Sequence, residues 1–262
     1  MKNYRAVGIM SGTSLDGLDI VLCNFTYNNV WSFQIEKSLT IKYSKDWQTK
    51  LSSAPSLSGY ELTLLDKEYG RFIGNSVKDF LTNCTSPIDV IASHGHTVFH
   101  QPNKKLTLQI GNGQEIAIAT GIKTICNFRS LDVALGGQGA PLVPVGDQFL
   151  FPEYDFCMNI GGFANISFDD KGKRVAYDIG PANIVLNYLA NKLGHPIDKN
   201  GALGFLGKSD DQLLNELNSL SYYSLNRPKS LGKEWLEQIF LPILNRSNLS
   251  IHNQLKTVYE HI

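Results

Sequence analysis

The segment GIMSGTSLDGLD at residues 8–19 constrains the fold of this chain most strongly. Apolar residues precede it at 4–10 and follow it at 18–25, which predicts two strands joined by a tight turn. The turn contains hydroxyl side chains and two glycines, Gly12 and Gly17, which adopt positive φ without steric cost. Hydroxyls and uncovered backbone N–H groups that converge in one bend form a concave site for an anion such as phosphate. An ordinary polar hairpin turn is the alternative interpretation.

Asp16 is the unusual residue of this turn, because a carboxylate repels phosphate unless a cation lies between them. The combination indicates Mg²⁺ and a nucleoside triphosphate, since Mg²⁺ keeps several of its waters and takes few protein ligands. We therefore expect Asp16 to contact the metal through water and the turn to hold the β- and γ-phosphates. The expected phosphate-binding residues are Ser11, Gly12, Thr13, Ser14, Leu15, Asp16 and Gly17.

The charge balance and the cysteines exclude several classes of partner. Lysine plus arginine equals aspartate plus glutamate, at 24 residues each, so no net field attracts nucleic acid or a membrane surface. The cysteines lie far apart without a CxxC pair, which favours free thiols in a reducing compartment over disulfides or a zinc site. They are Cys23, Cys84, Cys126 and Cys157.

Length and hydropathy favour a soluble, cytoplasmic, globular protein. No apolar run approaches the length of a membrane span. The chain enters a strand-like run almost at its first residue, which does not fit a cleavable signal peptide. Its 262 residues suffice for one large domain or two ordinary ones.

Hydrophobic periodicity predicts strands followed by helices in the first half of the chain. Residues 59–82 carry apolar side chains at three- and four-residue spacing, as in a helix with one buried face. The short, wholly apolar run 88–92 fits a central buried strand. An opening meander followed by helices indicates an α/β sheet with helices packed on it. The remaining predictions are strands at 4–10, 18–25, 31–42, 106–110 and 122–126 and helices at 45–51 and 114–120, the second ending at Gly121.

The second half repeats the opening pattern of strand, glycine turn and strand, which indicates two domains of one design. The Gly-rich, proline-terminated segment 136–141 is the expected boundary, which gives domains at 1–143 and 144–262. The last predicted helix reaches Ile262 without a cap, so we expect the second domain to be incomplete at its C-terminus. The predicted elements are strands at 156–160, 164–168 and 175–177 and helices at 184–193, 209–217, 233–244 and from 250 onward.

A polar segment, SHGHTVFH at 93–100, follows the buried strand at a position where ligands collect in α/β sheets. His94, His96 and His100 would share one face of a strand, so a metal site is one interpretation. No carboxylate lies at a matching spacing, and a loop that contains Gly95 is a poor frame for a metal. Ligand contacts or structural hydrogen bonds are therefore favoured for these histidines.

Asp178 precedes the predicted helix at 184–193, and Pro181 suits the first turn of that helix. A carboxylate placed there, in a cleft beside a phosphate loop, could take a proton from an attacking water and so act as a general base. Capping of the helix N-terminus is the alternative interpretation, and the two roles are compatible.

Seven segments, in order and in spacing over residues 6–240, resemble the anhydro-N-acetylmuramic acid kinase family. The resemblance implies the two-domain sugar kinase/Hsp70/actin-like (ribonuclease H-like) fold, with ATP in the cleft between the domains. It also implies a bacterial enzyme of cell-wall recycling that opens the 1,6-anhydro ring with water and phosphorylates O6, giving N-acetylmuramic acid 6-phosphate and ADP. The segments are SGTSLDG, SHGHTVFH, NFRSLD, GGQGAPLVP, NIGGFAN, DIGPAN and RPKSLGKE.

Within the resemblance, Asp178 is the general base and the glycine turn at 159–162 is the second phosphate-side loop, with a plain β-turn as the alternative. Arg129 is a natural partner for the lactyl carboxylate of the sugar through two parallel hydrogen bonds, with an ion pair to Asp132 as the alternative. The implied sugar-binding residues are His94, Gly95, Thr97, Arg129, Asp178, Gly180 and Asn183, and the further nucleotide-binding residues are Asp19, Asn159, Gly161 and Gly162.

The chain departs from the family pattern in two respects. Family members are longer, and their tail carries a Gly-rich segment that packs against adenosine and a carboxylate that helps hold the sugar. Another sugar kinase or ATPase of the same fold, or a non-catalytic sugar- or nucleotide-binding fragment, is therefore an alternative function. Family members are often dimeric, which makes a homodimer a further expectation. The substituted positions are His96 for the usual glutamine, Asn127 for aspartate, Ile179 for threonine and Ala182 for glycine.

Overall fold

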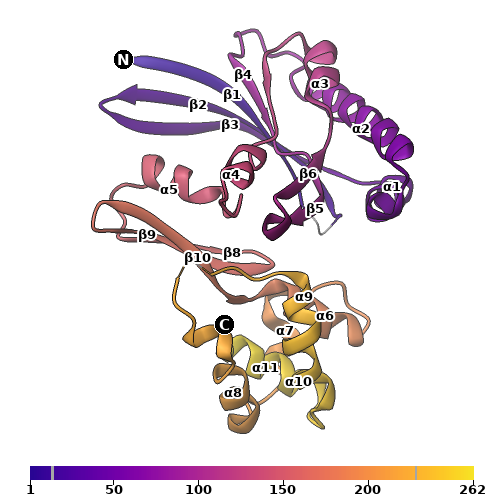
Figure 1. Cartoon of the computed structure of the whole chain (residues 1–262), viewed down its shortest axis with the longest axis vertical. Helices are drawn as coiled ribbons and strands as arrows, with labels where there is room; N and C mark the ends of the chain where they lie inside the picture. The colour runs from indigo at the N-terminus through magenta and orange to yellow at the C-terminus, as the bar shows by residue number, and fades with distance from the viewer. Residues whose placement is uncertain (13–14, 228) are drawn as a thin grey trace. The chain divides into compact units, whose positions relative to one another are not determined.

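The computed structural model describes residues 1–12, 15–227 and 229–262 (Figure 1). The chain divides into two compact units, Met1–Leu142 and Val143–Ile262, each with its own hydrophobic core. Both units combine a β-sheet with helices, so the predicted α/β fold class is confirmed. What each unit contributes to function stays a prediction.

A five-stranded sheet with the strand order β3-β2-β1-β4-β7 forms the centre of unit 1, Met1–Leu142 (Figure 1). Strands β1, β2 and β3 form an antiparallel meander, whereas β4 and β7 run parallel to β1. β5 and β6 pair with each other in a separate hairpin. The predicted strands of this half are thus confirmed. Their bounds are β1 (Lys2–Ser11), β2 (Gly17–Asn28), β3 (Val30–Lys42), β4 (Val90–Ser93), β5 (His96–Gln101), β6 (Leu106–Ile110) and β7 (Thr124–Ile125).

The long helix α2 (Gly59–Phe80) packs its apolar face against this sheet, as its periodicity predicts. A capping box begins the helix: the Ser58 hydroxyl accepts from the Glu61 N–H, and the Glu61 carboxylate accepts from the Ser58 N–H. Each fully buried, large apolar side chain on the inner face of α2 stabilises the fold by about 1.5–3 kcal/mol. The buried hydrophobic residues of the helix are Leu65, Tyr69, Ile73, Val77 and Phe80.

Two glycines of α2 let helix α3 (Gly113–Thr120) approach closely. A Cβ on Gly70 would lie 2.7 Å from the carbonyl oxygen of Asn112, and a Cβ on Gly74 would lie 2.7 Å from a side chain of α3. The predicted end of this helix is confirmed, because Gly121 has a φ of 71°. The shorter helices of this unit are α1 (Lys45–Ser53), η1 (Ala54–Ser56), η2 (Pro102–Lys104) and α4 (Ser130–Ala134).

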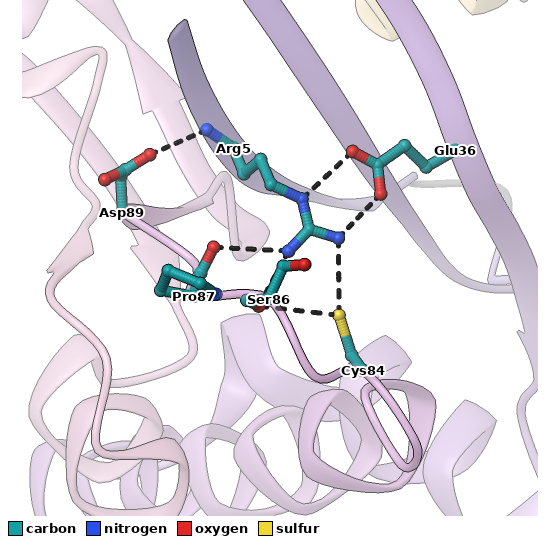
Figure 2. A network of polar contacts seen from close by, with 6 residues as sticks. All are labelled: Arg5, Glu36, Cys84, Ser86, Pro87 and Asp89. Atoms are coloured by element: carbon teal, nitrogen blue, oxygen red, sulfur yellow. Dashed lines mark hydrogen bonds and ion pairs between the residues drawn. The ribbon is translucent and has the colours of Figure 1, made fainter.

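Figure 2 shows a polar network that joins β1 to β3 and to the connection between α2 and β4. The Arg5 guanidinium donates to both carboxylate oxygens of Glu36, at 3.0 and 2.6 Å. It also donates to the carbonyl oxygens of Ser86 at 2.7 Å and Pro87 at 3.2 Å, and the Arg5 N–H donates to Asp89 at 2.7 Å. Because the guanidinium is planar and satisfied on several sides, it fixes the register of these segments.

Replacing Glu36 by Gln should lower the free energy of unfolding by about 1 kcal/mol at neutral pH, since a bidentate charged contact is lost. The hydrogen bond from Arg5 lowers the pKa of Glu36. The contribution of Glu36 is therefore present above its ordinary pKa and is lost as the pH falls through the lower, folded-state value. Urea unfolding across pH 3–7 measures this difference. Glu68→Gln is the control, because Glu68 pairs with Lys50 at an exposed position, and an equal loss in both variants would contradict the prediction.

A three-stranded antiparallel sheet with the order β10-β9-β8 follows the N-terminal helix of unit 2, Val143–Ile262. Among the described residues, β8 pairs with β9 alone. The side chains of Phe156, Met158 and Ile160 on β8 are 62%, 59% and 53% exposed. The predicted second meander is confirmed, with strands β8 (Phe156–Ile160), β9 (Phe163–Asp170) and β10 (Lys173–Pro181).

The helices of unit 2 bury a second core that includes Leu189, Leu217 and Phe240. The predicted single helix over 233–244 is interrupted by a π-helical turn, because Pro242 has no N–H to donate to the preceding turn. The elements are α5 (Val143–Leu150), α6 (Asn183–Lys192), η3 (Lys199–Gly201), α7 (Ala202–Phe205), α8 (Asp211–Asn218), η4 (Ser221–Ser224), α9 (Lys233–Trp235), the π-helix η5 (Leu236–Phe240), α10 (Leu241–Arg246) and α11 (Ile251–His261).

The predicted helix at 184–193 is confirmed as α6, but the placement of Pro181 in its first turn, with Asp178 just before it, is wrong. Pro181 is the last residue of β10, paired with Phe163 of β9, and helix α6 begins at Asn183 after Ala182. β10 is an edge strand, which tolerates a proline because no further strand needs its N–H. Asp178 therefore lies within a strand, and capping of the helix is excluded as its role.

Two predictions from composition can be compared with the structure. All four cysteines are free thiols, as predicted. Within residues 1–12, 15–227 and 229–262, no helix has the length and apolar character needed to cross a membrane.

Candidate functional site

The first candidate phosphate loop connects the end of β1 to the start of β2. Ser11 is the last residue of β1 and Gly17 the first of β2, so the connection has the predicted hairpin geometry. The Leu15 N–H donates to the Gly12 carbonyl at 3.4 Å, and Asp16 is exposed. The predicted residues Thr13 and Ser14 lie outside the described residues.

Asp19 differs from the loop residues because it lies on β2, where Thr40 of β3 donates to its carboxylate at 2.5 Å. This cross-strand hydrogen bond accounts for one oxygen of Asp19. The structure thus places Asp19 beside the meander, two residues beyond the end of the loop.

Ser11 is the third of four buried side chains that are joined in a row through their hydroxyl groups and one ring nitrogen. The Tyr69 and Tyr43 hydroxyls lie 2.5 Å apart, the Tyr43 hydroxyl donates to Ser11 Oγ at 2.9 Å, and Ser11 Oγ lies 3.4 Å from His96 Nδ1. None of the four is more than 6% exposed. The Ser11 hydroxyl therefore faces the interior of unit 1.

His94 and Arg129 form a second polar pair in unit 1, and their hydrogen bonds fix the tautomer of the histidine. His94 Nδ1 lies 2.8 Å from the Gly95 carbonyl oxygen and must donate to it, so Nε2 carries the lone pair that accepts from Arg129 Nε at 3.0 Å. Burial and the neighbouring guanidinium lower the pKa of His94, which keeps the ring neutral. Arg129 Nη1 donates to the Gly139 carbonyl at 2.5 Å.

The alternative ion pair between Arg129 and Asp132 is wrong. Asp132 accepts from the Gly139 N–H at 2.6 Å, whereas Arg129 binds His94 and the Gly139 carbonyl. Among the described residues no partner accepts from Nη2 of Arg129, so this edge of the guanidinium is available to a carboxylate. The backbone around Gly139 thus orients Arg129 without neutralising it.

The three histidines are not brought together as a metal site. His94 faces Arg129, His96 faces Ser11, and His100 lies 3.1 Å from the Thr107 hydroxyl in the hairpin of β5 and β6. In the part of the chain that the structure describes, no group of three or more histidine, cysteine, aspartate or glutamate side chains could hold a metal ion. The metal interpretation of these histidines has no geometric support.

His96 should make the stability of the protein pH-dependent, because burial lowers its pKa to about 4 from the ordinary 6.5. A histidine with a lowered pKa in the folded state stabilises the fold above pH 6.5 and loses this contribution as the pH falls towards 4. Replacing His96 by Gln should remove about 1–2 kcal/mol of the stability loss between pH 7 and pH 5. Chemical unfolding at both pH values measures it. His195→Gln is the control, and identical pH slopes for wild type and His96→Gln would refute the prediction.

Gly95 and Thr97 flank His96 in the predicted sugar segment. Gly95 has a φ of 73°, and a Cβ there would lie 2.4 Å from the Ile110 carbonyl oxygen, so only glycine fits. The Thr97 hydroxyl accepts from Gln109 at 3.4 Å. Both residues contact β6, which fixes the conformation of this segment.

In unit 2 the glycine turn between β8 and β9 packs on the start of α6. The Gly162 carbonyl accepts from the N–H groups of Ala182 and Ile184 at 2.8 and 3.2 Å, and the Gly161 carbonyl accepts from the Asn183 N–H at 3.1 Å. The Asn183 side chain also donates to the Gly161 carbonyl at 3.0 Å. The turn therefore caps the helix, which is more than a plain β-turn provides.

Asp178 lies at a β-bulge of β10 that changes the direction of its side chain. The register with β9 shifts between Asp178 and Gly180, so that Ile179 is the extra residue. One Asp178 carboxylate oxygen accepts from the Leu231 N–H at 2.8 Å. Burial raises the pKa of Asp178, and the hydrogen bond from Leu231 opposes this. A half-buried carboxylate with a raised pKa and a fixed position suits a general base.

η4 and the segment after it hold the backbone at Asp178, and sequence reasoning did not assign them this role. The Asp178 N–H donates to the Lys229 carbonyl at 3.2 Å, and the Tyr222 hydroxyl donates to the Asp178 carbonyl at 2.6 Å. Lys229 Nζ in turn donates to the carbonyls of Tyr222 and Tyr223. These partners lie more than 40 positions along the chain, and no local pattern marks them.

The remaining predicted residues of unit 2 lie near Asp178 along the sheet. Gly180 is buried, and a Cβ there would lie 3.4 Å from the Tyr223 hydroxyl. Asn165 of the middle strand, β9, pairs with Asn159 of β8 on one side and with Asp178 of β10 on the other. In unit 2 the predicted residues thus lie on neighbouring strands and at the start of α6.

Two α/β units that each contain an antiparallel meander, together with a match to a kinase family model, assign the chain to the kinases of the sugar kinase/Hsp70/actin superfamily. The family model described as anhydro-N-acetylmuramic acid kinase matches residues 4–258. The chain belongs to this family.

Relatives with that same description come from Shewanella loihica and Shewanella baltica. The first is 38% identical over an alignment of 254 positions that covers 91% of this chain and 69% of the relative. The second is 38% identical over an alignment of 271 positions that covers 97% of this chain and 73% of the relative. This chain therefore spans about 70% of the length of these relatives.

Similar solved structures include the PPX-GPPA enzyme of Aquifex aeolicus and a hexokinase of Schistosoma mansoni in complex with glucose. The first has a TM-score of 0.35 at 11% identity and covers 73% of this chain and 56% of that one. The second has a TM-score of 0.33 at 13% identity and covers 67% of this chain and 40% of that one.

Proposed function

We propose that this protein opens the ring of 1,6-anhydro-N-acetylmuramic acid with water and transfers the γ-phosphoryl group of ATP to O6. The observation that carries the proposal is Asp178, a half-buried carboxylate with a raised pKa, held by a backbone N–H on a β-bulge. Family membership supports the substrate and the nucleotide.

In the proposed reaction, Asp178 accepts a proton from the water whose oxygen bonds to the anomeric carbon. The bond between that carbon and O6 breaks, and O6 takes the γ-phosphoryl group while ADP leaves. The products are N-acetylmuramic acid 6-phosphate and ADP. Asp178 acts by orienting the water and holding its proton, so its fixed position is as important as its basicity.

The loop from Ser11 to Gly17 is proposed to hold the phosphates of ATP together with Mg²⁺. The exposed Asp16 carboxylate fits a water-mediated contact to this ion, because Mg²⁺ takes oxygen ligands and retains waters. The ion would neutralise charge on the phosphates. Gly161 and Gly162 are proposed to border the nucleotide from unit 2, with Asn159 beside them.

The sugar is proposed to contact Arg129 through its lactyl carboxylate. The guanidinium is oriented by His94 and Gly139 through Nε and Nη1, and its Nη2 group is proposed to donate to the carboxylate. Gly95 and Thr97 are proposed to supply polar contacts from unit 1, and His94, whose two ring nitrogens are both hydrogen-bonded, is proposed to act by orienting Arg129. Gly180 and Asn183 border the sugar from unit 2.

The test incubates the protein with ATP, Mg²⁺ and the anhydro sugar, and measures ADP release and the mass of the product. The expected product exceeds the substrate by one water and one HPO₃. A product that gains HPO₃ alone would indicate an ordinary sugar kinase. Sugar binding without ADP release would indicate a non-catalytic binding protein, and either result would overturn the proposal.

A further inference from the structure

Tyr43 contacts both ends of the candidate phosphate loop. Its hydroxyl donates to the Ser11 side chain at 2.9 Å, and its backbone N–H donates to the Asp16 carbonyl oxygen at 3.4 Å. Ser11 closes the strand that enters the loop, and Asp16 precedes the strand that leaves it. We infer that Tyr43 is a positioning residue that fixes the separation and orientation of the two loop ends, an inference that rests on the proposed phosphate-binding role of the loop.

The hydroxyls of Tyr69, Tyr43 and Ser11 form a chain of hydrogen bonds in which each tyrosine donates to the next hydroxyl. Since the Tyr43 hydroxyl donates its only proton to Ser11, the Tyr69 hydroxyl must donate to Tyr43, 2.5 Å away. Burial raises the pKa of both tyrosines, so both remain protonated donors. Ser11 thus receives a defined hydrogen bond from one side and faces His96 Nδ1 at 3.4 Å on the other. A buried hydroxyl held between two partners has one orientation.

The position of Tyr43 is itself rigid. It lies between β3 and α1, and its ring centroid is 6.4 Å from that of Tyr69 and 6.2 Å from that of Phe72. Trp47 of α1 packs on Phe72 with centroids 4.8 Å apart. These ring contacts hold Tyr43 against α2. The packed core of unit 1 therefore sets where the Tyr43 hydroxyl and N–H lie relative to the loop.

A third contact to the loop comes from the beginning of helix α1. The Gln48 side chain donates to the Leu15 carbonyl at 3.3 Å. Ser11, Leu15 and Asp16 are thus bonded to the short segment from Tyr43 to Gln48, which lies outside the loop in sequence. The loop receives its support from the beginning of α1 at several points rather than from its own turn alone.

The test replaces Tyr43 by Phe, which keeps the ring packing and removes the hydroxyl. Amide hydrogen exchange of residues 12–17, measured without sugar or nucleotide, should accelerate about 3- to 10-fold, as expected for one net hydrogen bond. Exchange in α2 should stay unchanged. In turnover assays, kcat should fall and the KM for ATP should rise by a similar factor, with the KM for the sugar unchanged. A general structural defect would instead accelerate exchange throughout unit 1.

Tyr60→Phe is the matched control, because Tyr60 is 75% exposed at the start of α2. A second variant, Ser11→Ala, removes the acceptor, and combining it with Tyr43→Phe should add no further acceleration. Loop exchange in Tyr43→Phe that equals that of Tyr60→Phe would overturn the inference. The exchange readout is independent of catalysis, so absence of ADP release in the wild type would overturn the proposed function and leave this inference to be decided by exchange.

Discussion

Replacement of Asp178 by Asn should lower kcat by roughly 10²- to 10⁴-fold, the usual contribution of a general base. Asparagine keeps an oxygen that accepts from the Leu231 N–H, so the bulge and the fold should be preserved. The amide cannot take a proton from water at neutral pH. The KM for ATP and the melting temperature should therefore change little, and steady-state ADP release together with thermal unfolding measures both.

Asp169→Asn is the matched control on the neighbouring strand, because the Asp169 side chain is 59% exposed and its ion pair with Arg174 is long, at 3.7 Å. It should turn over as the wild type does. The raised pKa of Asp178 adds a pH signature, since the base acts only when ionised. Activity of the wild type should fall at acidic pH through a value above that of an ordinary aspartate. Turnover of Asp178→Asn near that of the control would reject Asp178 as the base.

Replacement of Arg129 by Lys should raise the KM for the sugar about 10- to 100-fold, because charged hydrogen bonds contribute about 1.5–3 kcal/mol each. Lysine keeps the charge and loses the planar fork that binds a carboxylate through two hydrogen bonds. It also gives up the simultaneous contacts to His94 and the Gly139 carbonyl that orient the guanidinium. The KM for ATP should stay near that of the wild type.

A second substrate makes this test specific. An anhydro sugar without the lactyl group should be used equally poorly by the wild type and by Arg129→Lys, because the carboxylate that Arg129 binds is missing. Arg71→Lys is the control variant, since Arg71 pairs with Glu115 at an exposed position of α2. An undiminished loss on the lactyl-free sugar would assign Arg129 a structural role instead.

Much of the fold could be predicted from the sequence because its signals are local. The α2 face, its capping box and the stop at Gly121 each follow from residues within a few positions of one another. The two meanders follow from apolar runs between glycine turns. The elements predicted less well involve competition: Pro242 interrupts a periodic helix, and Pro181 remains in a strand although it also suits the first turn of a helix.

The supports of the candidate site could not be predicted because they are long-range. Leu231 lies 53 positions from Asp178, and Tyr43 lies 32 positions from Ser11. The bulge at Ile179 depends on the register with β9, which single residues do not encode. At position 127 the residue type matches the backbone conformation. Asn127 has a φ of 59°, in the left-handed region that asparagine adopts more readily than most residues.

The outer margin of the unit 2 sheet has a consequence for how the polypeptide behaves in solution. Within the described residues β8 bonds to β9 alone, and its sequence FCMNI contains no charged side chain that would discourage a further strand. The exposed apolar side chains of Phe156, Met158 and Ile160 lie on this same strand. The strand is thus a template to which another extended segment can add, from the same polypeptide or from a second molecule. An unpaired strand edge with exposed apolar side chains favours association at high concentration.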